Sequence, residues 1–415
     1  MLNDPSLNFS NIPKELNLLI EILKSKNNKE SLSFRRELFR DINWDTFLRL
    51  AKHHRVYPLA YIKLKELDQR LVPSRIIQAL YQEYKINTFQ MLQLSGEVEQ
   101  VSKLFSENQI RTLFLKGPVL AKDIYNDISL RTSKDIDILI SIDDLEKTHR
   151  LLLEYGYEPE ETGQIKKVIR RWGKHHVAYS SPKKGIQIEV HWRLHPPPTK
   201  EPSFNELWKR KRQSNLTTYP VYFLGKKDLL LYLIDHGNRH GWFRLRWLTD
   251  IDLVIRNLVI SKQNSKVFNA RKGYHLDQEA NFLRIQALIL ANQLLETPID
   301  EEAKLIIEEK HSKRLIGLAI TSIVQMGNPS SKQSEIAFES YTHRLHLIKS
   351  DLKRALLINW YLFLMKPNIH KIIFLGDLLK PYLLGNKGVQ LLQQTLPSLN
   401  FLLLWKKKKS KKAHK

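Results

Sequence analysis

Two aspartates one residue apart, inside an apolar segment, constrain the fold of this chain more than any other feature. Asp135 and Asp137 belong to residues 133–140, which read SKDIDILI. Side chains alternate between the two faces of a β-strand, so the pattern predicts a strand with both carboxylates on one face and isoleucines on the other. Adjacent anions repel each other and are usually neutralised by a cation, and oxygen ligands select Mg²⁺ or Mn²⁺. The segment predicts half of a two-metal site, with a solvated strand face as the alternative.

The residues before this segment predict a strand that runs into a helix. Residues 111–115 read as a strand that ends at Lys116, Gly117 and Pro118. Glycine allows close backbone approach, and proline suits the first position of a helix, which we expect over residues 119–125. Helix N-termini of this kind bind phosphate groups.

A third carboxylate follows on a later strand. Residues 185–192 alternate between polar and apolar side chains, which places Gln187, Glu189 and His191 on one face. Glu189 is therefore a candidate to join the two aspartates. We expect His191 to orient a neighbouring group through a hydrogen bond rather than to bind the metal.

These motifs, in this order, resemble the nucleotidyltransferase superfamily related to DNA polymerase β. The signature of that superfamily is a glycine-containing strand-to-helix turn, an acid-x-acid strand and a further acid on a later strand. More narrowly, the chain resembles the family of uncharacterised nucleotidyltransferases, from about residue 44 to beyond residue 256. The matching positions are residues 115–118, Tyr125, Arg131, and residues 133–137, 156–157, 189–194, 235–236 and 246–250.

The resemblance implies a Mg²⁺-dependent or Mn²⁺-dependent transferase. Such an enzyme moves a nucleoside monophosphate from a nucleoside triphosphate such as ATP to an acceptor and releases pyrophosphate. The catalytic and metal-binding residues that it implies are Asp135, Asp137 and Glu189. The nucleotide-binding residues that it implies are Lys116, Gly117, Arg131 and Ser133.

One position departs from the superfamily pattern. Many members have a serine after the glycine of the turn, and its hydroxyl contacts the phosphates, but this chain has Pro118. We expect Lys116 to supply a positive charge to the triphosphate in its place. We also expect that removing one aspartate of the pair relieves repulsion and leaves the fold intact.

Two further residues, His236 and Asp250, are candidates for the cleft. His236 and His240 are four residues apart on a predicted helix, which is the spacing of a metal pair, but Gly237 weakens the helix and no glutamate follows His236. The resemblance instead implies that His236 and Asp250 line the cleft with His191, or brace the helical region against the core.

The expected fold class is α+β, with a small nucleotidyltransferase α/β core that contains a mixed sheet. Helical periodicity predicts an N-terminal helical region over residues 1–108. The catalytic core covers residues 109–195, and three prolines at residues 196–198 mark its end. A C-terminal helical region follows over residues 196–405, and a basic tail covers residues 406–415.

Composition limits the location and the partners. The sequence has no cysteine, which excludes disulfides and thiolate metal sites and fits a cytoplasmic protein. No apolar run reaches the roughly 20 residues that a membrane-spanning helix needs. The formal net charge is +24, and the lysines of the tail account for less than a third of it. The basic body therefore favours anionic partners, of which a nucleoside triphosphate is one and RNA another.

The acceptor stays open at this point. It is an anionic or hydroxyl-bearing molecule, and the basic residues 166–174 around Trp172 form either a surface for it or a solvated segment. The basic tail is either a solubilising end or a peripheral contact with anionic membranes or nucleic acid. The alternative functions are a catalytically silent nucleotide-binding relative and an RNA-binding protein with the same fold.

Overall fold

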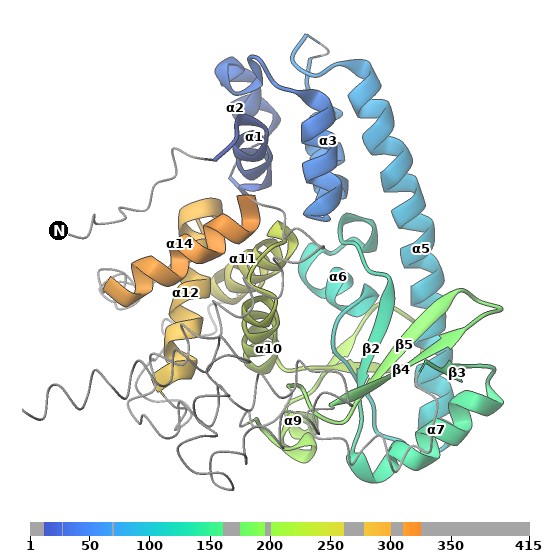
Figure 1. The fold of residues 1–415 in the computed structure, drawn as a ribbon. Helices are drawn as coiled ribbons and strands as arrows, with labels where there is room; N and C mark the ends of the chain where they lie inside the picture. The colour runs from blue at the N-terminus through green and yellow to red at the C-terminus, as the bar shows by residue number, and fades with distance from the viewer. Residues whose placement is uncertain are drawn as a thin grey trace, which may run out of the picture. The chain divides into compact units, whose positions relative to one another are not determined.

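The computed structural model of the chain describes seven stretches of residues. They are residues 12–26, 28–68, 70–160, 175–195, 201–260, 278–299 and 310–324 (Figure 1). The basic segment around Trp172, the three prolines at residues 196–198 and the basic tail lie outside them. Within these stretches, the helices are too short or too polar to cross a membrane.

The N-terminal part of the chain is helical, as predicted. Its helices are α1 (Lys14–Leu23), α2 (Lys29–Phe34), the short η2 (Arg36–Phe39), α3 (Trp44–His53), α4 (Tyr57–Leu64) and the long α5 (Ser74–Glu107). Local sequence sets several of the starts. The Asn43 side chain accepts a hydrogen bond from the backbone N–H of Thr46 at 2.9 Å, which caps α3. Pro58 lies in the first turn of α4, where its missing N–H does no harm.

A seven-stranded mixed sheet follows, in the order β3-β4-β5-β2-β1-β7-β6. The strands are β1 (Leu113–Phe114), β2 (Asp135–Leu139), β3 (Glu158–Pro159), β4 (His176–Ser181), β5 (Ile186–His191), β6 (Arg212–Ser214) and β7 (Val221–Phe223). The pairs β2/β5 and β1/β7 are parallel, and the other neighbours are antiparallel. This mixed sheet between helical regions confirms the predicted fold class.

The apolar face of the sheet packs against two helices. Ile136 and Ile138 of β2 and Ile188 of β5 share one buried cluster with side chains of α5 and of α7 (Leu145–Glu154). Figure 1 shows α7 and the C-terminal half of α5 next to these strands. The alternation predicted from sequence therefore holds, because the isoleucines face the helices and leave the opposite face to the polar residues.

Two strands lie beyond the predicted end of the core. Residues 196–405 were expected to be helical, but β6 and β7 form an antiparallel pair, and β7 extends the sheet by pairing with β1. Each strand has three residues, which is too short to show the period of two that identifies a strand. The sheet therefore continues past the three prolines.

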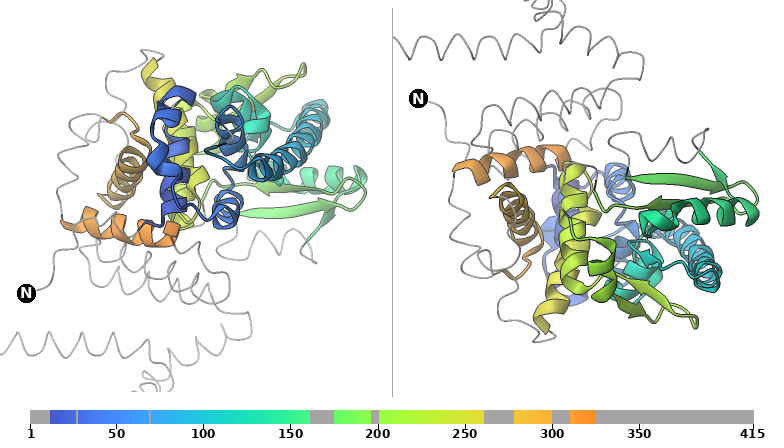
Figure 2. Two further views of the ribbon diagram at one scale, coloured as in Figure 1. Left: turned by 90° about the horizontal axis from the view of Figure 1, so that it is seen from above. Right: turned by 90° about the horizontal axis from the view of Figure 1, so that it is seen from below.

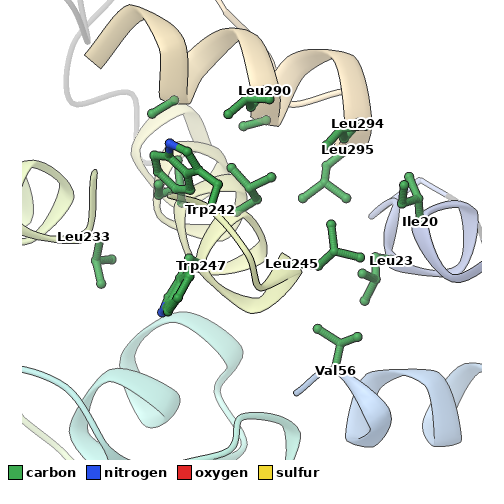
Figure 3. Packing of buried hydrophobic residues seen from close by; sticks show 14 of the residues in the cluster. Ile20, Leu23, Val56, Leu233, Trp242, Leu245, Trp247, Leu290, Leu294 and Leu295 are labelled. Carbon is green, nitrogen blue, oxygen red and sulfur yellow. The ribbon is translucent and has the colours of Figure 1, made fainter. Parts of the chain in front are cut away.

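The later helices form a second core together with the N-terminal ones. They are α9 (Phe204–Lys209), α10 (Lys226–Arg239), α11 (Leu245–Ile260), α12 (Gln278–Leu295) and α14 (Lys310–Val324). Leu290 and Leu294 of α12, Leu245 of α11 and Ile20 of α1 belong to one cluster, part of which is drawn in Figure 3. The views in Figure 2 show α1, α11 and α12 side by side. The N-terminal and C-terminal helices therefore stabilise each other.

Gly237, in the last turn of α10, makes room for a tryptophan of this core. Trp242 is 1% exposed, and its indole N–H donates to Asn238 Oδ1 at 2.9 Å. A Cβ atom on Gly237 would overlap the Trp242 ring. The glycine that weakens the helix pattern in the sequence is therefore required by packing.

We expect Gly237→Ala to lower the free energy of unfolding by about 1–3 kcal/mol, because the overpacked indole must move. Alanine is the better helix former by about 1 kcal/mol, so helix propensity alone predicts the opposite sign. Gly96→Ala on α5 is the matched control, since a Cβ atom there meets nothing within 4 Å. That variant should be as stable as the wild type or more so. Urea unfolding followed by circular dichroism measures both, and equal behaviour of the two variants would contradict the packing of Trp242 against α10.

Candidate active site

The parallel pairing of β2 with β5 places the carboxylates of the two strands side by side. Asp135 lies opposite Gln187, and Asp137 lies opposite Glu189. Paired residues of neighbouring strands point to the same face, so Asp137 and Glu189 are direct neighbours on the polar face. Asp137 is 1% exposed, whereas the Glu189 side chain is 25% exposed. The two anions are thus close together, with one buried and one accessible.

The turn after β1 brings a lysine to the buried aspartate. The backbone N–H of Leu115 donates to the carbonyl oxygen of Asp137 at 2.9 Å, which fixes the start of the turn next to β2. Gly117 has φ 73° and lies where a Cβ atom would come within 3.4 Å of the carbonyl oxygen of Asp135. A side chain at residue 117 would be strained in this left-handed conformation. Helix α6 (Pro118–Tyr125) then starts directly after Gly117.

Lys116 and Asp137 form an ion pair, with Lys116 Nζ 3.0 Å from Asp137 Oδ1. Burial disfavours both charges, but the pair outweighs burial, so the pKa of Lys116 is raised and the pKa of Asp137 is lowered. His191 contributes to the low pKa of Asp137. Lys116 is thus the counter-ion of Asp137 in the protein alone.

His191 lies between the two carboxylates. Its Nε2 atom is 3.4 Å from Asp137 Oδ1 and 3.3 Å from Glu189 Oε2. These are ion-pair distances without hydrogen-bond geometry, since both ring nitrogens are buried and make no hydrogen bond. Burial lowers the pKa of His191, but the two carboxylates raise it more, so its pKa is above the usual value. The two carboxylates therefore favour the charged form of the imidazole.

The donor set of Asp137, Glu189 and His191 fits a divalent ion. One ligand atom of each residue lies within 4.8 Å of the others. Both oxygens of Asp137 are buried, and among the described residues no donor reaches Oδ2, although buried polar atoms are normally satisfied. Two carboxylates are typical of Mg²⁺ or Mn²⁺ ligands. These residues can therefore hold the metal that the sequence predicts.

Asp135 lies beside this group, at the start of β2. Burial and the neighbouring Asp137 charge raise the pKa of Asp135. Ser133 Oγ donates to the Asp135 carbonyl oxygen at 3.3 Å and to Oδ1 at 3.4 Å. Ser133, expected to bind the nucleotide, thus orients Asp135.

The metal-ligand group of the described residues includes His191, for which we had predicted an orienting role.

Arg131, expected to bind the nucleotide, is paired with Asp250. Arg131 Nε lies 3.0 Å from Asp250 Oδ1, and Nη2 lies 3.1 Å from Oδ2. The Tyr125 hydroxyl also donates to Asp250 Oδ1, at 2.8 Å. Arg131 and Asp250 are both buried. Asp250 was expected either to line the cleft or to brace the helical region against the core. Its contacts favour the bracing role, because it joins α11 to α6 and to the loop that leads into β2.

Helix α10 supplies a second wall of polar side chains. Tyr232, His236 and Arg239 are spaced four and three residues apart, so they lie on one face of the helix. Burial and then the Lys116 charge hold the pKa of His236 well below its usual range, so His236 is neutral and close to Lys116. The Tyr232 hydroxyl is buried and makes no hydrogen bond. His236 is therefore near Lys116, and its role in lining the cleft stays a prediction.

Three imidazoles form a second candidate metal group. Ligand atoms of His175, His176 and His191 lie within 4.8 Å of one another. Arg239 donates to His175 Nε2 at 3.2 Å and to His236 Nδ1 at 3.3 Å. A guanidinium next to His175 disfavours a cation there. The carboxylate group is therefore the better metal site.

Three arginines near Asp135 were not predicted. Burial raises the pKa of Asp135 and lowers the pKa of Arg55, and in each case a nearby opposite charge, Arg246 and Asp135 respectively, opposes the shift. Arg244 is close enough to Arg246 to lower its pKa. The one signal in the sequence is that Arg55 ends a polar run, His53 to Arg55, at a helix boundary. The contact of that run with α11 is tertiary, and a single sequence does not reveal it.

Comparisons with known proteins give two matches. The crystal structure of an antigenic nucleotidyltransferase-like protein from Paracoccidioides brasiliensis is 16% identical, with a TM-score of 0.30. The match covers 51% of this chain and 95% of that chain, and it is too weak to support an argument. No curated protein is significantly similar to the sequence.

The other match is to a protein family. The model of the family described as uncharacterised nucleotidyltransferase matches residues 40–288, which is more than half of the chain. The matched region includes the turn at Gly117, both carboxylate strands and the helices α10 and α11. The chain belongs to this uncharacterised nucleotidyltransferase family.

Proposed function

We propose that this protein transfers a nucleoside monophosphate from a nucleoside triphosphate to an acceptor hydroxyl, with Mg²⁺ or Mn²⁺ as the cofactor and pyrophosphate as the second product. The observation that carries the proposal is the buried Asp137 carboxylate. It faces Glu189 and His191, and among the described residues no donor reaches its buried Oδ2 atom. A buried carboxylate with an unsatisfied oxygen, in a nucleotidyltransferase family, is best explained as a metal ligand.

Each residue of the site has a role in this proposal. Asp137, Glu189 and Asp135 would hold the divalent ion, and His191 is a further candidate ligand. When bound, such an ion neutralises charge on the phosphates and makes an acceptor hydroxyl more acidic. Glu189 is far more exposed than Asp137, so it is the carboxylate that an entering hydroxyl reaches and the group that takes its proton.

The nucleotide side is formed by the turn after β1. The backbone at Gly117 approaches the phosphates, and Lys116 adds a positive charge. Ser133 orients Asp135, and Arg131 acts from a distance by holding α11 and the loop before β2 through Asp250. ATP is the nucleotide that we would test first. The acceptor is a hydroxyl-bearing or anionic molecule, with RNA among the candidates, and we place the activity in the cytoplasm.

We expect Asp137→Asn to abolish Mn²⁺ binding and pyrophosphate release, because the buried ligand loses its charge. From the sequence we expected this change to relieve repulsion, but the ion pair with Lys116 leads us to expect a loss of stability. Lys116 would lose its counter-ion, so the free energy of unfolding should fall by about 2 kcal/mol. Titration calorimetry with Mn²⁺, and phosphate release in the presence of pyrophosphatase with each of the four triphosphates, measure the effect. Asp143→Asn, at an exposed acid of the same core, is the control and should behave as the wild type.

The pH dependence of metal binding should follow His191. The metal-free site favours a protonated imidazole, because Asp137 and Glu189 raise its pKa above the usual value. A bound cation must displace that proton, so Mn²⁺ affinity should rise as the pH increases from 6 to 8. His191→Asn should flatten this dependence. An equally steep profile in His191→Asn would show that another group titrates.

Lys116 separates a nucleotide-binding role from a structural one. In Lys116→Met the ammonium no longer competes for Asp137, so Mn²⁺ should bind more tightly while the KM for the triphosphate increases about tenfold. If Lys116 were purely structural, Lys116→Met would lower the free energy of unfolding without changing Mn²⁺ binding and the KM for the triphosphate in this way. Lys122→Met on α6 is the control, because its ammonium donates only to the Asn126 carbonyl oxygen. Unchanged nucleotide binding in a folded Lys116→Met protein would place the triphosphate elsewhere.

A further inference from the structure

Three chain segments meet beside Asp135. The Leu245 N–H donates to His54 Nδ1 at 3.3 Å, and the Arg246 N–H donates to the His54 carbonyl oxygen at 3.3 Å. His53 Nε2 also lies 3.1 Å from the Phe243 carbonyl oxygen. The turn between α3 and α4 is therefore fixed against the start of α11.

The third segment is the loop that leads into β2. Arg246 Nη1 donates to the carbonyl oxygen of Thr132 and lies 3.3 Å from its hydroxyl. Thr132 is three residues before Asp135. The junction therefore brings Arg55, Arg244 and Arg246 to the edge of the candidate active site.

These three guanidinium groups have no carboxylate partner. Among the described residues, no carboxylate lies within ion-pair distance of Arg55, Arg244 or Arg246. The Nε atoms of Arg244 and Arg246 are buried and have no hydrogen-bond acceptor. Arg246 is 7% exposed. Buried charges are normally paired, so a bound anion would stabilise the charge of Arg246.

The arginines destabilise one another's charges. Burial, together with the nearby Arg55, lowers the pKa of Arg244 to about 10. Burial and the neighbouring arginines Arg131, Arg55 and Arg244 lower the pKa of Arg246 to about 9, although Asp250 opposes the effect. An anion that binds between them would relieve this repulsion.

The other cations that were expected to bind phosphate are already paired. Lys116 is bound to Asp137, and Arg131 is bound to Asp250. In contrast, Arg244 keeps free donors and is held in place by the rings of Phe243 and Trp247, whose centroids lie 4.9 Å and 5.9 Å from its Cζ atom. Guanidinium groups match the geometry of phosphate oxygens, and three of them suit a ligand with several negative charges.

We propose that Arg55, Arg244 and Arg246 form a binding site for two adjacent phosphoryl groups, next to Asp135. The proposal rests on the nucleotidyl-transfer function, because it places a substrate of that reaction at the junction of α3, α4 and α11. Two molecules carry this chemistry: the triphosphate of the nucleotide, and an acceptor that bears a diphosphate.

Binding of inorganic pyrophosphate to the full chain tests the site. Titration calorimetry in EDTA excludes any contribution of a divalent ion. The wild type should bind pyrophosphate, and Arg55→Gln and Arg244→Gln should each weaken binding about tenfold or more. Arg49→Gln, which removes the same charge from an exposed position on α3, should have no effect. Both site variants should unfold at or above the wild-type temperature, since each removes a repelling charge.

The same variants distinguish the two sources of the phosphates. If ATP affinity falls together with pyrophosphate affinity, the site holds the triphosphate. If ATP affinity is unchanged while pyrophosphate affinity falls, the site holds the acceptor. No pyrophosphate binding by the wild type, or unchanged binding in the folded variants, would overturn the arginine site.

Failure of the arginine site and failure of the nucleotidyl-transfer proposal give different experimental results. Unchanged pyrophosphate binding with an intact Mn²⁺ response at Asp137 rejects the arginine site alone. Weakened pyrophosphate binding in a protein that neither binds Mn²⁺ nor turns over any triphosphate rejects the transferase instead.

Discussion

The burial of Asp137 beside Glu189 is the constraint on which the rest of the site depends. Parallel pairing of β2 and β5 puts the two carboxylates in register, and Asp137 is buried there. Their repulsion must be neutralised by nearby cationic side chains. Lys116 does this from the turn after β1, and His191 does it from the end of β5. The turn at Gly117 is thus needed for the electrostatics of the protein alone, before any ligand binds.

The second constraint is the buried pair of Arg131 and Asp250. It joins the sheet to α11, so the helical part of the chain determines where the loop before β2 lies. Breaking a buried pair leaves an uncompensated charge, which is strongly destabilising. The pair therefore keeps the carboxylate strand and the helices that cover it in one arrangement, and it positions Arg246 and Asp135 near each other.

Local patterns predicted the fold and the carboxylates because both depend on short-range rules. The period of two assigned Asp135, Asp137 and Glu189 to polar strand faces, and helical periodicity assigned α10 and α11. Strands of three residues, such as β7, carry no such period. The partners of Lys116 and Arg131, and the meeting of Arg55 with Arg246, depend on chain segments far apart in sequence. One sequence contains no information on those distances, so the pairing of Arg131 with Asp250 was not predicted.

Helix α5 connects the two buried clusters of the protein in a single rigid element. Its N-terminal part, with Ile76 and Leu80, packs into the helical cluster, and its later part, from Met91 to Phe105, packs against the sheet. Leu80 and Met91 are separated by almost a whole number of turns, since each residue rotates the helix by about 100°. Inserting one residue between them would turn one packing face away from its cluster. The number of residues between Leu80 and Met91 therefore fixes how the two packing faces of α5 are oriented relative to each other. If this segment were one or two residues longer or shorter, the two faces could not both meet their clusters.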